Sequence, residues 1–96
     1  MIDLAPEHLA LVRRILATRL PGLEVRVFGS RVTGRARRTS DLDLALMTQA
    51  PLDLLVLADL RDAFSESDLP MRVDLVDWST TAPAFRRIIG EHFEVL

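Results

Sequence analysis

The sequence contains no cysteine, no lysine and no tyrosine. Without cysteine, the chain can form no disulfide, no zinc site built on thiolates and no thiol nucleophile. Without lysine, all 12 of its basic residues are arginines. The planar guanidinium of arginine is suited to bidentate contact with phosphate or carboxylate, so any anion site made by side-chain cations here depends on that group.

Long apolar runs and a strong net charge are also lacking. No stretch approaches the roughly 18 consecutive apolar residues of a transmembrane helix, and the N-terminal segment lacks the basic region and apolar core of a signal peptide. The net charge of -2 and the isoelectric point of 5.6 argue against a surface that binds polyanions throughout. We therefore expect a cytoplasmic, soluble protein that binds neither membranes nor nucleic acid directly.

The length of 96 residues predicts one domain, 1–96, because domains commonly have about 100 to 200 residues. Apolar spacing predicts helices over 6–20, over 52–67 and between Ser79 and Gly90, and alternation predicts strands over 24–28, 42–47 and 71–78. A short helix with Ser30 as its N-cap would follow the first strand, and the final FEVL could add another strand. This α-β-(short α)-β-α-β-α-(β) order predicts a small α/β domain with a mixed sheet.

Two aspartates, Asp41 and Asp43, lie two positions apart at the start of the second expected strand. Residues two apart in a strand share a face, so both carboxylates project away from Leu42 and Leu44. Asp74 lies within the third expected strand and adds a third carboxylate if the two strands are neighbours. Hard divalent cations such as Mg²⁺ prefer such oxygen ligands. The alternative for an isolated D-x-D is an acidic strand end that faces solvent.

The pair Gly29-Ser30 ends the first expected strand, and four arginines follow it at positions 31, 35, 37 and 38. A glycine lets a phosphate group approach the backbone, and a serine at a helix start offers a hydroxyl and N–H groups to an anion. The arginines could neutralise a polyphosphate. For Arg35 and Arg37 we favour the alternative, a solvent-facing role with salt bridges to nearby acids.

Other polar residues receive no catalytic role. Asp77 falls on the opposite strand face from Asp74, which favours a surface or capping acid over a further metal ligand. His8 and His92 have no acid or nucleophile at a spacing typical of a catalytic pair, so we expect surface residues. Neither a P-loop nor an EF-hand loop is present.

Together these motifs resemble the nucleotidyltransferases of the DNA polymerase beta superfamily, and most closely their minimal, single-domain members. The family pattern is G-S, a variable stretch with an internal glycine, S-D-x-D before apolar strand residues, and a third aspartate on a later strand. This sequence has Gly29-Ser30, Gly34, Ser40-Asp41-Leu42-Asp43 and Asp74. The resemblance covers essentially the whole chain, and the combined motif is far more specific than its parts.

The resemblance implies an enzyme that uses two magnesium ions to transfer a nucleotide, expected to be AMP from ATP, to a hydroxyl group with release of pyrophosphate. The catalytic and metal-binding residues would be Asp41, Asp43 and Asp74. The nucleotide-binding residues would be Gly29, Ser30 and Arg31 together with the first two aspartates.

Minimal members of the family look like the antitoxins of bacterial toxin-antitoxin pairs, whose HEPN-family ribonuclease partners can be silenced by adenylylation of a tyrosine. Because this chain has no tyrosine, such a modification would occur on the partner. The rival interpretation is a non-catalytic antitoxin that masks its partner by contact and keeps a regulatory nucleotide site. An excess of apolar residues over 54–60 fits an interface with a partner or a second copy, or a helix buried on two sides.

Overall fold

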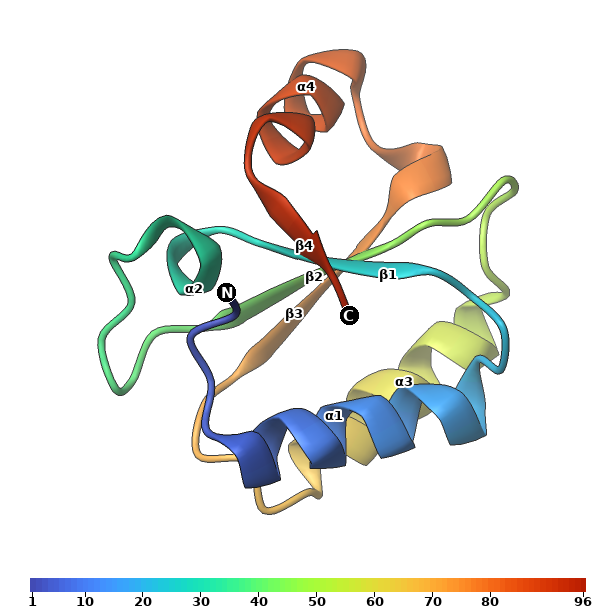
Figure 1. Cartoon of the computed structure of the whole chain (residues 1–96). Coiled ribbons are helices and arrows are strands. Elements are labelled where there is room, and N and C mark those ends of the chain that lie inside the picture. Colours follow the sequence, from blue (N-terminus) through green and yellow to red (C-terminus); the bar gives the residue numbers. More distant parts are fainter.

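A four-stranded sheet lies between helices on its two faces (Figure 1). The computed structural model describes all residues, 1–96. Its elements are α1 (Pro6–Arg19), β1 (Val25–Phe28), α2 (Ser30–Thr33), β2 (Leu42–Leu46), α3 (Leu54–Ser65), β3 (Val73–Asp77), the 3-10 helix η1 (Trp78–Thr80), α4 (Pro83–Glu91) and β4 (Phe93–Val95). The predicted α/β order, with its short second helix and final strand, is confirmed. None of the helices has the length and apolar character needed to cross a membrane.

The sheet is mixed, with the strand order β3-β2-β1-β4. β1 is antiparallel to both β2 and β4, whereas β2 and β3 are parallel. A parallel pair needs a crossover connection, and α3 provides it between these two strands. The register of the parallel pair places Asp43 opposite Asp74, and that of the antiparallel pair places Phe28 opposite Asp43.

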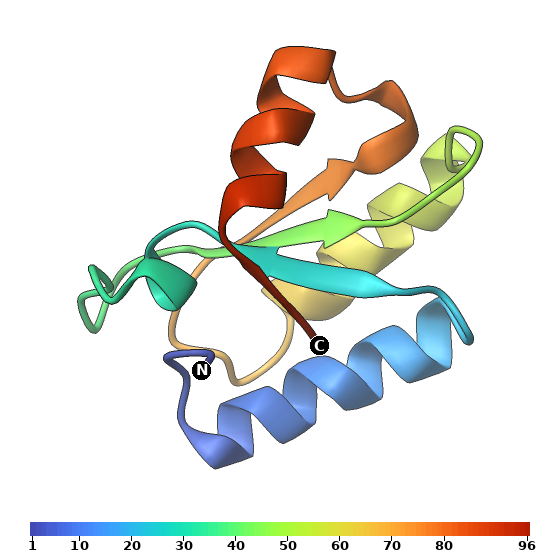
Figure 2. The same ribbon diagram turned by 45° about the horizontal axis from the view of Figure 1, so that its top comes forward.

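The two faces of the sheet have different coverings, as both views show (Figures 1 and 2). On one face α1 and α3 bury the main core, to which β2 contributes Leu42, Leu44 and Leu46. On the other face lie α4 and a smaller buried cluster of Phe28, Ala45 and Ile89. Because side chains of a strand alternate between faces, Asp43 of β2 shares the α4 face with Ala45.

Several helix ends differ from the sequence prediction. α3 begins at Leu54, two residues late, because the Asp53 side chain accepts a hydrogen bond from the Leu55 backbone N–H and caps the helix there. α4 begins at Pro83 and continues through Gly90 to Glu91, because η1 occupies the residues after β3. The prediction of Ser30 as an N-cap is wrong, since Ser30 is the first residue of α2 and Gly29 occupies the N-cap position.

The apolar excess of α3 is exposed. Leu54 and Leu55 are 80% and 79% exposed, whereas Leu60 on the opposite side is completely buried. The alternative of a helix buried on two sides is therefore wrong. An uncovered pair of leucines at the start of a helix is available for contact with another molecule.

Asp77 joins the end of β3 to the loop that precedes α3. Its carboxylate accepts hydrogen bonds from the Leu52 backbone N–H at 2.8 Å, from the Ser79 hydroxyl at 2.7 Å and from the Thr48 hydroxyl. The interpretation of Asp77 as a capping acid is confirmed, because it also accepts from the Ser79 backbone N–H at the start of η1.

Asp77→Ala should lower the free energy of unfolding by about 1–3 kcal/mol, because the partly buried Leu52 N–H and Ser79 hydroxyl lose their acceptor. Burial opposes ionisation of Asp77, but the hydrogen bonds from Leu52, Thr48 and Ser79 outweigh it and lower the pKa of the carboxyl below its usual value. Its contribution is thus present above the unfolded pKa of about 3.9 and lost as the pH falls through the folded value. Asp77→Asn removes the charge but keeps the size of the side chain, so its free energy of unfolding in urea should approach that of the wild type at acidic pH. A difference between the two proteins that stays constant with pH would contradict this.

Candidate active site

Three aspartates lie on the α4 face of the sheet at the β2–β3 junction. Asp43 in β2 is paired in register with Asp74 in β3, and Asp41 directly precedes β2. Leu42 and Leu44 are completely buried in the core on the opposite face, which fixes the direction of the alternate residues. The parallel pairing of the two strands therefore brings together all three aspartates that the sequence singles out.

The three carboxylates are close enough to affect one another. Burial, followed by the negative charges of Asp74 and Asp41, raises the pKa of Asp43 to about 6. The guanidinium of Arg72 opposes this effect. Its Nη2 lies 2.9 Å from Oδ2 of Asp41 and its Nε lies 3.7 Å from Oδ1 of Asp74, so one cation bridges two of the acids.

The donor set fits a hard divalent cation. Magnesium takes carboxylate oxygens as ligands, and the position between Asp41 and Asp74 already attracts the positive charge of Arg72. In the present arrangement no three acidic or histidine side chains converge on a single metal position. Binding of one ion by all three acids would therefore require their side chains to rotate, whereas one or two carboxylates with phosphate oxygens are a common ligand set for magnesium.

Gly29 lies directly against Asp43. Its backbone has φ 78° and ψ -155°, a conformation that is essentially restricted to glycine. A methyl group at this position would overlap Oδ2 of Asp43 and lie 3.2 Å from its Cγ. Ser30 follows at the start of α2, where its half-buried hydroxyl makes no hydrogen bond within the chain. Glycine is therefore required here both for the turn and for the space that Asp43 occupies.

Arg31 is placed differently from the sequence prediction of a nucleotide-binding residue. Its side chain is buried, with 5% exposed. The guanidinium donates hydrogen bonds to backbone carbonyl oxygens at 2.8 Å (Ser40), 2.9 Å (Asp3), 3.3 Å (Arg38) and 3.4 Å (Arg37). Arg31 thus ties the loop before β2 to the N-terminal segment, and its donors are directed at the backbone rather than at a phosphate group.

Sequence reasoning missed Arg72. The available signal was its position two residues before Asp74, which predicts a shared strand face. Arg35 and His92 are exposed, as the sequence predicts, although Arg35 forms none of the expected salt bridges. With Val32 and Thr33 they line an open hollow of about 500 Å³ beside α2. This hollow places a cationic side chain next to the same short helix that begins with Ser30.

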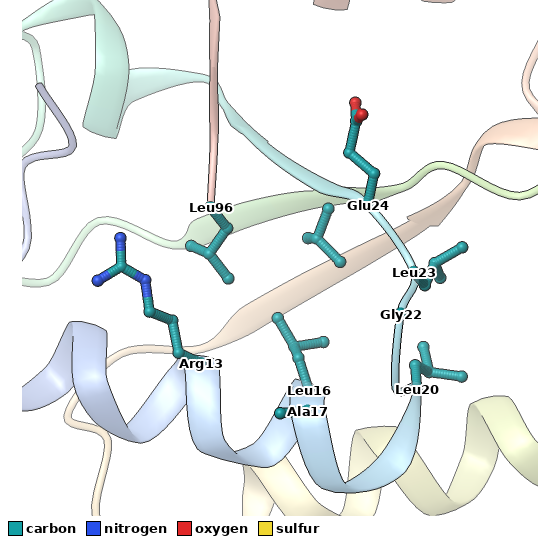
Figure 3. Close-up of a pocket in the computed structure, with 9 residues that line it drawn as sticks. Arg13, Leu16, Ala17, Leu20, Gly22, Leu23, Glu24 and Leu96 are labelled. Atoms are coloured by element: carbon teal, nitrogen blue, oxygen red, sulfur yellow. The ribbon is translucent and has the colours of Figure 1, made fainter.

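A second hollow of about 190 Å³ lies between α1 and the start of β1 (Figure 3). Leucine side chains at positions 16, 20, 23 and 96 contribute to its lining, and the carboxylate of Glu24 points away from Leu16. Because it lies on the α1 side of the sheet and carries no cluster of acids or nucleophiles, we interpret it as a gap at the edge of the core.

Residues 13–96 match the family model of the polymerase beta nucleotidyltransferases. The chain belongs to this family. A relative from Haemophilus influenzae, the probable protein adenylyltransferase MntA, is 50% identical over 95 residues, which are 99% of this chain and 83% of that protein. The predicted enzyme class, nucleotidyltransferase, is thereby confirmed.

Solved structures of similar proteins have the same fold. A toxin-antitoxin with AMP-PNP is 25% identical, with a TM-score of 0.75, and the match covers 90% of this chain and 69% of that one. A mutant of the toxin-antitoxin MntA-HpeT has a TM-score of 0.75 at 24% identity, over 97% of this chain and 72% of that one, and shows the fold alone. The predicted minimal nucleotidyltransferase fold is confirmed.

Proposed function

We propose that this nucleotidyltransferase transfers AMP from ATP to a hydroxyl group of a partner protein, and that the partner is the HEPN-family toxin of a toxin-antitoxin pair in the cytoplasm. The observation that carries the proposal is the register of β2 and β3, which sets Asp43 opposite Asp74 with Gly29 against Asp43. The adenylyltransferase name of the relative at 50% identity supports AMP as the transferred group. The toxin-antitoxin with AMP-PNP supports both the nucleotide and the partner.

The residues suit the proposed reaction. Asp41, Asp43 and Asp74 would hold two magnesium ions, which would supply charge neutralisation to the triphosphate and to the departing pyrophosphate. The Ser30 hydroxyl would donate to a phosphate oxygen, and the bare backbone of Gly29 lets the triphosphate approach. Asp74 would take the proton as the acceptor oxygen bonds to the α-phosphorus and the bond to the β-phosphate oxygen breaks.

The acceptor belongs to another molecule in this proposal. The chain has no tyrosine, and Leu54 and Leu55 offer an uncovered apolar surface at the start of α3. The same exposed leucines favour a second candidate, an antitoxin that masks its toxin by contact alone. Both candidates predict a complex, but only the first predicts a covalent change.

Incubation of the protein with ATP, magnesium and the product of the neighbouring reading frame should add whole AMP residues to the partner and none to this chain. Intact-mass spectrometry of both chains measures this directly. Asp43→Asn should give the complex without the added mass. A complex that is never modified by the wild type would favour contact alone, and label on this chain would contradict action on a partner.

ATP with magnesium should also raise the melting temperature, because a ligand that binds only the folded state stabilises it by mass action. Ser30→Ala should reduce the shift by removing one donor to the phosphates. Thr33→Ala on the same short helix, whose side chain is exposed, is the matched control and should keep the shift. An equal shift in both variants would remove Ser30 from the nucleotide site.

A further inference from the structure

We propose that Arg72 is a positioning residue: it holds Asp41 and Asp74 together in the metal-free protein and releases Asp41 when a divalent cation binds. The inference rests on the proposed function, because it concerns the same carboxylates. Arg72 lies outside the G-S, S-D-x-D and third-aspartate motif that identified the family in this sequence.

The sheet fixes the backbone of Arg72. The residue directly precedes β3, and its carbonyl oxygen accepts a hydrogen bond from the Leu42 backbone N–H at 2.9 Å. Because it lies two positions before Asp74 in extended chain, its side chain leaves on the same face as that aspartate. This hydrogen bond to the start of β2 therefore fixes the backbone of Arg72 next to Asp41.

The guanidinium contacts acids from both strands. Nη2 lies 2.9 Å from Asp41 Oδ2, and Nε lies 3.7 Å from Asp74 Oδ1. The other arginine salt bridges of the protein involve Arg19 and Arg26, neither of which pairs with these aspartates. Arg72 is therefore the one side-chain cation that offsets repulsion among the three carboxylates through a salt bridge.

This pairing is easily exchanged. The Arg72 side chain is 74% exposed, and those of Asp41 and Asp74 are 36% and 48% exposed. Ion pairs in such solvated positions are weak, because water screens the attraction and the side chains lose freedom when they pair. A divalent cation carries twice the charge and coordinates oxygen directly, so it can take Asp41 from the guanidinium.

Two opposing effects follow from the position of Arg72. In the metal-free protein its charge keeps the acids near one another. The same charge repels an entering cation, and the Asp41 carboxylate cannot fully pair with the guanidinium and coordinate the cation at the same time. Removal of the guanidinium should therefore destabilise the metal-free protein slightly while it strengthens metal binding.

Calorimetric titration of the full chain with Mn²⁺, without nucleotide, tests this directly. Arg72→Gln should bind the ion roughly threefold to tenfold more tightly than wild type, since one nearby unit charge that repels it is gone. Arg72→Lys keeps the charge and should bind like wild type. Arg14→Gln on α1 makes the same charge change at an exposed arginine with no salt bridge, and should also bind like wild type.

Melting of the metal-free proteins gives a second readout. Arg72→Gln should melt below wild type in a chelator and reach the wild-type value when Mn²⁺ is added. Equal or weaker Mn²⁺ affinity in Arg72→Gln, or an equal gain in Arg72→Lys, would overturn the assignment of Arg72. Failure of the wild type itself to bind Mn²⁺ would instead count against the metal site of the proposed function.

Discussion

Asp43→Asn is expected to lower the rate of nucleotide transfer by about 10³-fold or more while the protein stays folded. Metal ions supply several kcal/mol of charge stabilisation to a transition state, and each 1.36 kcal/mol corresponds to a factor of about ten. The amide that replaces the carboxylate is a poorer ligand, and it is nearly the same size. Asp62→Asn on the exposed side of α3 is the matched control and should transfer at the wild-type rate.

The same substitution should remove a pH dependence of stability. The pKa of Asp43 is raised to about 6, first by burial and then by Asp74 and Asp41, whereas an unfolded aspartate has a pKa of about 3.9. Between these values the folded protein holds a proton that the unfolded chain has lost. The free energy of unfolding contributed by this group therefore falls as the pH rises through that window. In denaturant unfolding with a chelator present, the free energy of unfolding of Asp43→Asn should therefore rise relative to that of the wild type between about pH 4 and pH 7.

Wild-type transfer by Asp43→Asn with magnesium limiting would contradict the metal assignment. A difference in stability from wild type that stays constant with pH would instead contradict the electrostatic account of Asp43. The two measurements are independent, because the first needs nucleotide and metal and the second uses neither.

Gly29→Ala should be severely destabilising and should also remove activity in whatever fraction remains folded. The backbone conformation at φ 78° and ψ -155° costs a non-glycine residue about 1–3 kcal/mol, and the overlap of the new methyl group with the Asp43 carboxylate adds to that cost. Relief of the overlap requires movement of Asp43 or of the turn. We expect a transfer rate at least about 10²-fold below wild type, since small displacements of reacting groups can cost that much.

Two other glycines separate the causes. Gly34 has a similar φ of 79°, but no atom lies within 4 Å of the position that an added methyl group would take, so Gly34→Ala should cost only the backbone strain of about 1–2 kcal/mol. Gly90 lies inside α4 with open space around it, so Gly90→Ala should stabilise the helix by about 0.5–1 kcal/mol. Chemical unfolding measures all three. Equal losses at Gly29 and Gly34 would show that contact with Asp43 is unimportant.

The sequence alone was sufficient for the local features of the site. Alternation along an extended chain already predicts that Asp41 and Asp43 share a face, because the period of two is a property of any strand. Gly29 could likewise be singled out at the end of a strand, before a possible helix start. The family resemblance and the order of elements follow from such short-range patterns, and the structure and the comparisons confirm both.

Only the tertiary structure decided which distant groups meet. The crossover through α3 sets β3 parallel to β2. The register of this strand pair, rather than any local sequence pattern, places Asp74 opposite Asp43. Arg31 and Arg72 show the same limit, since both are arginines near motif residues. One is buried among backbone carbonyls and the other bridges two acids at the surface, because burial and partners depend on how the loop before β2 and the start of β3 pack against the rest of the chain.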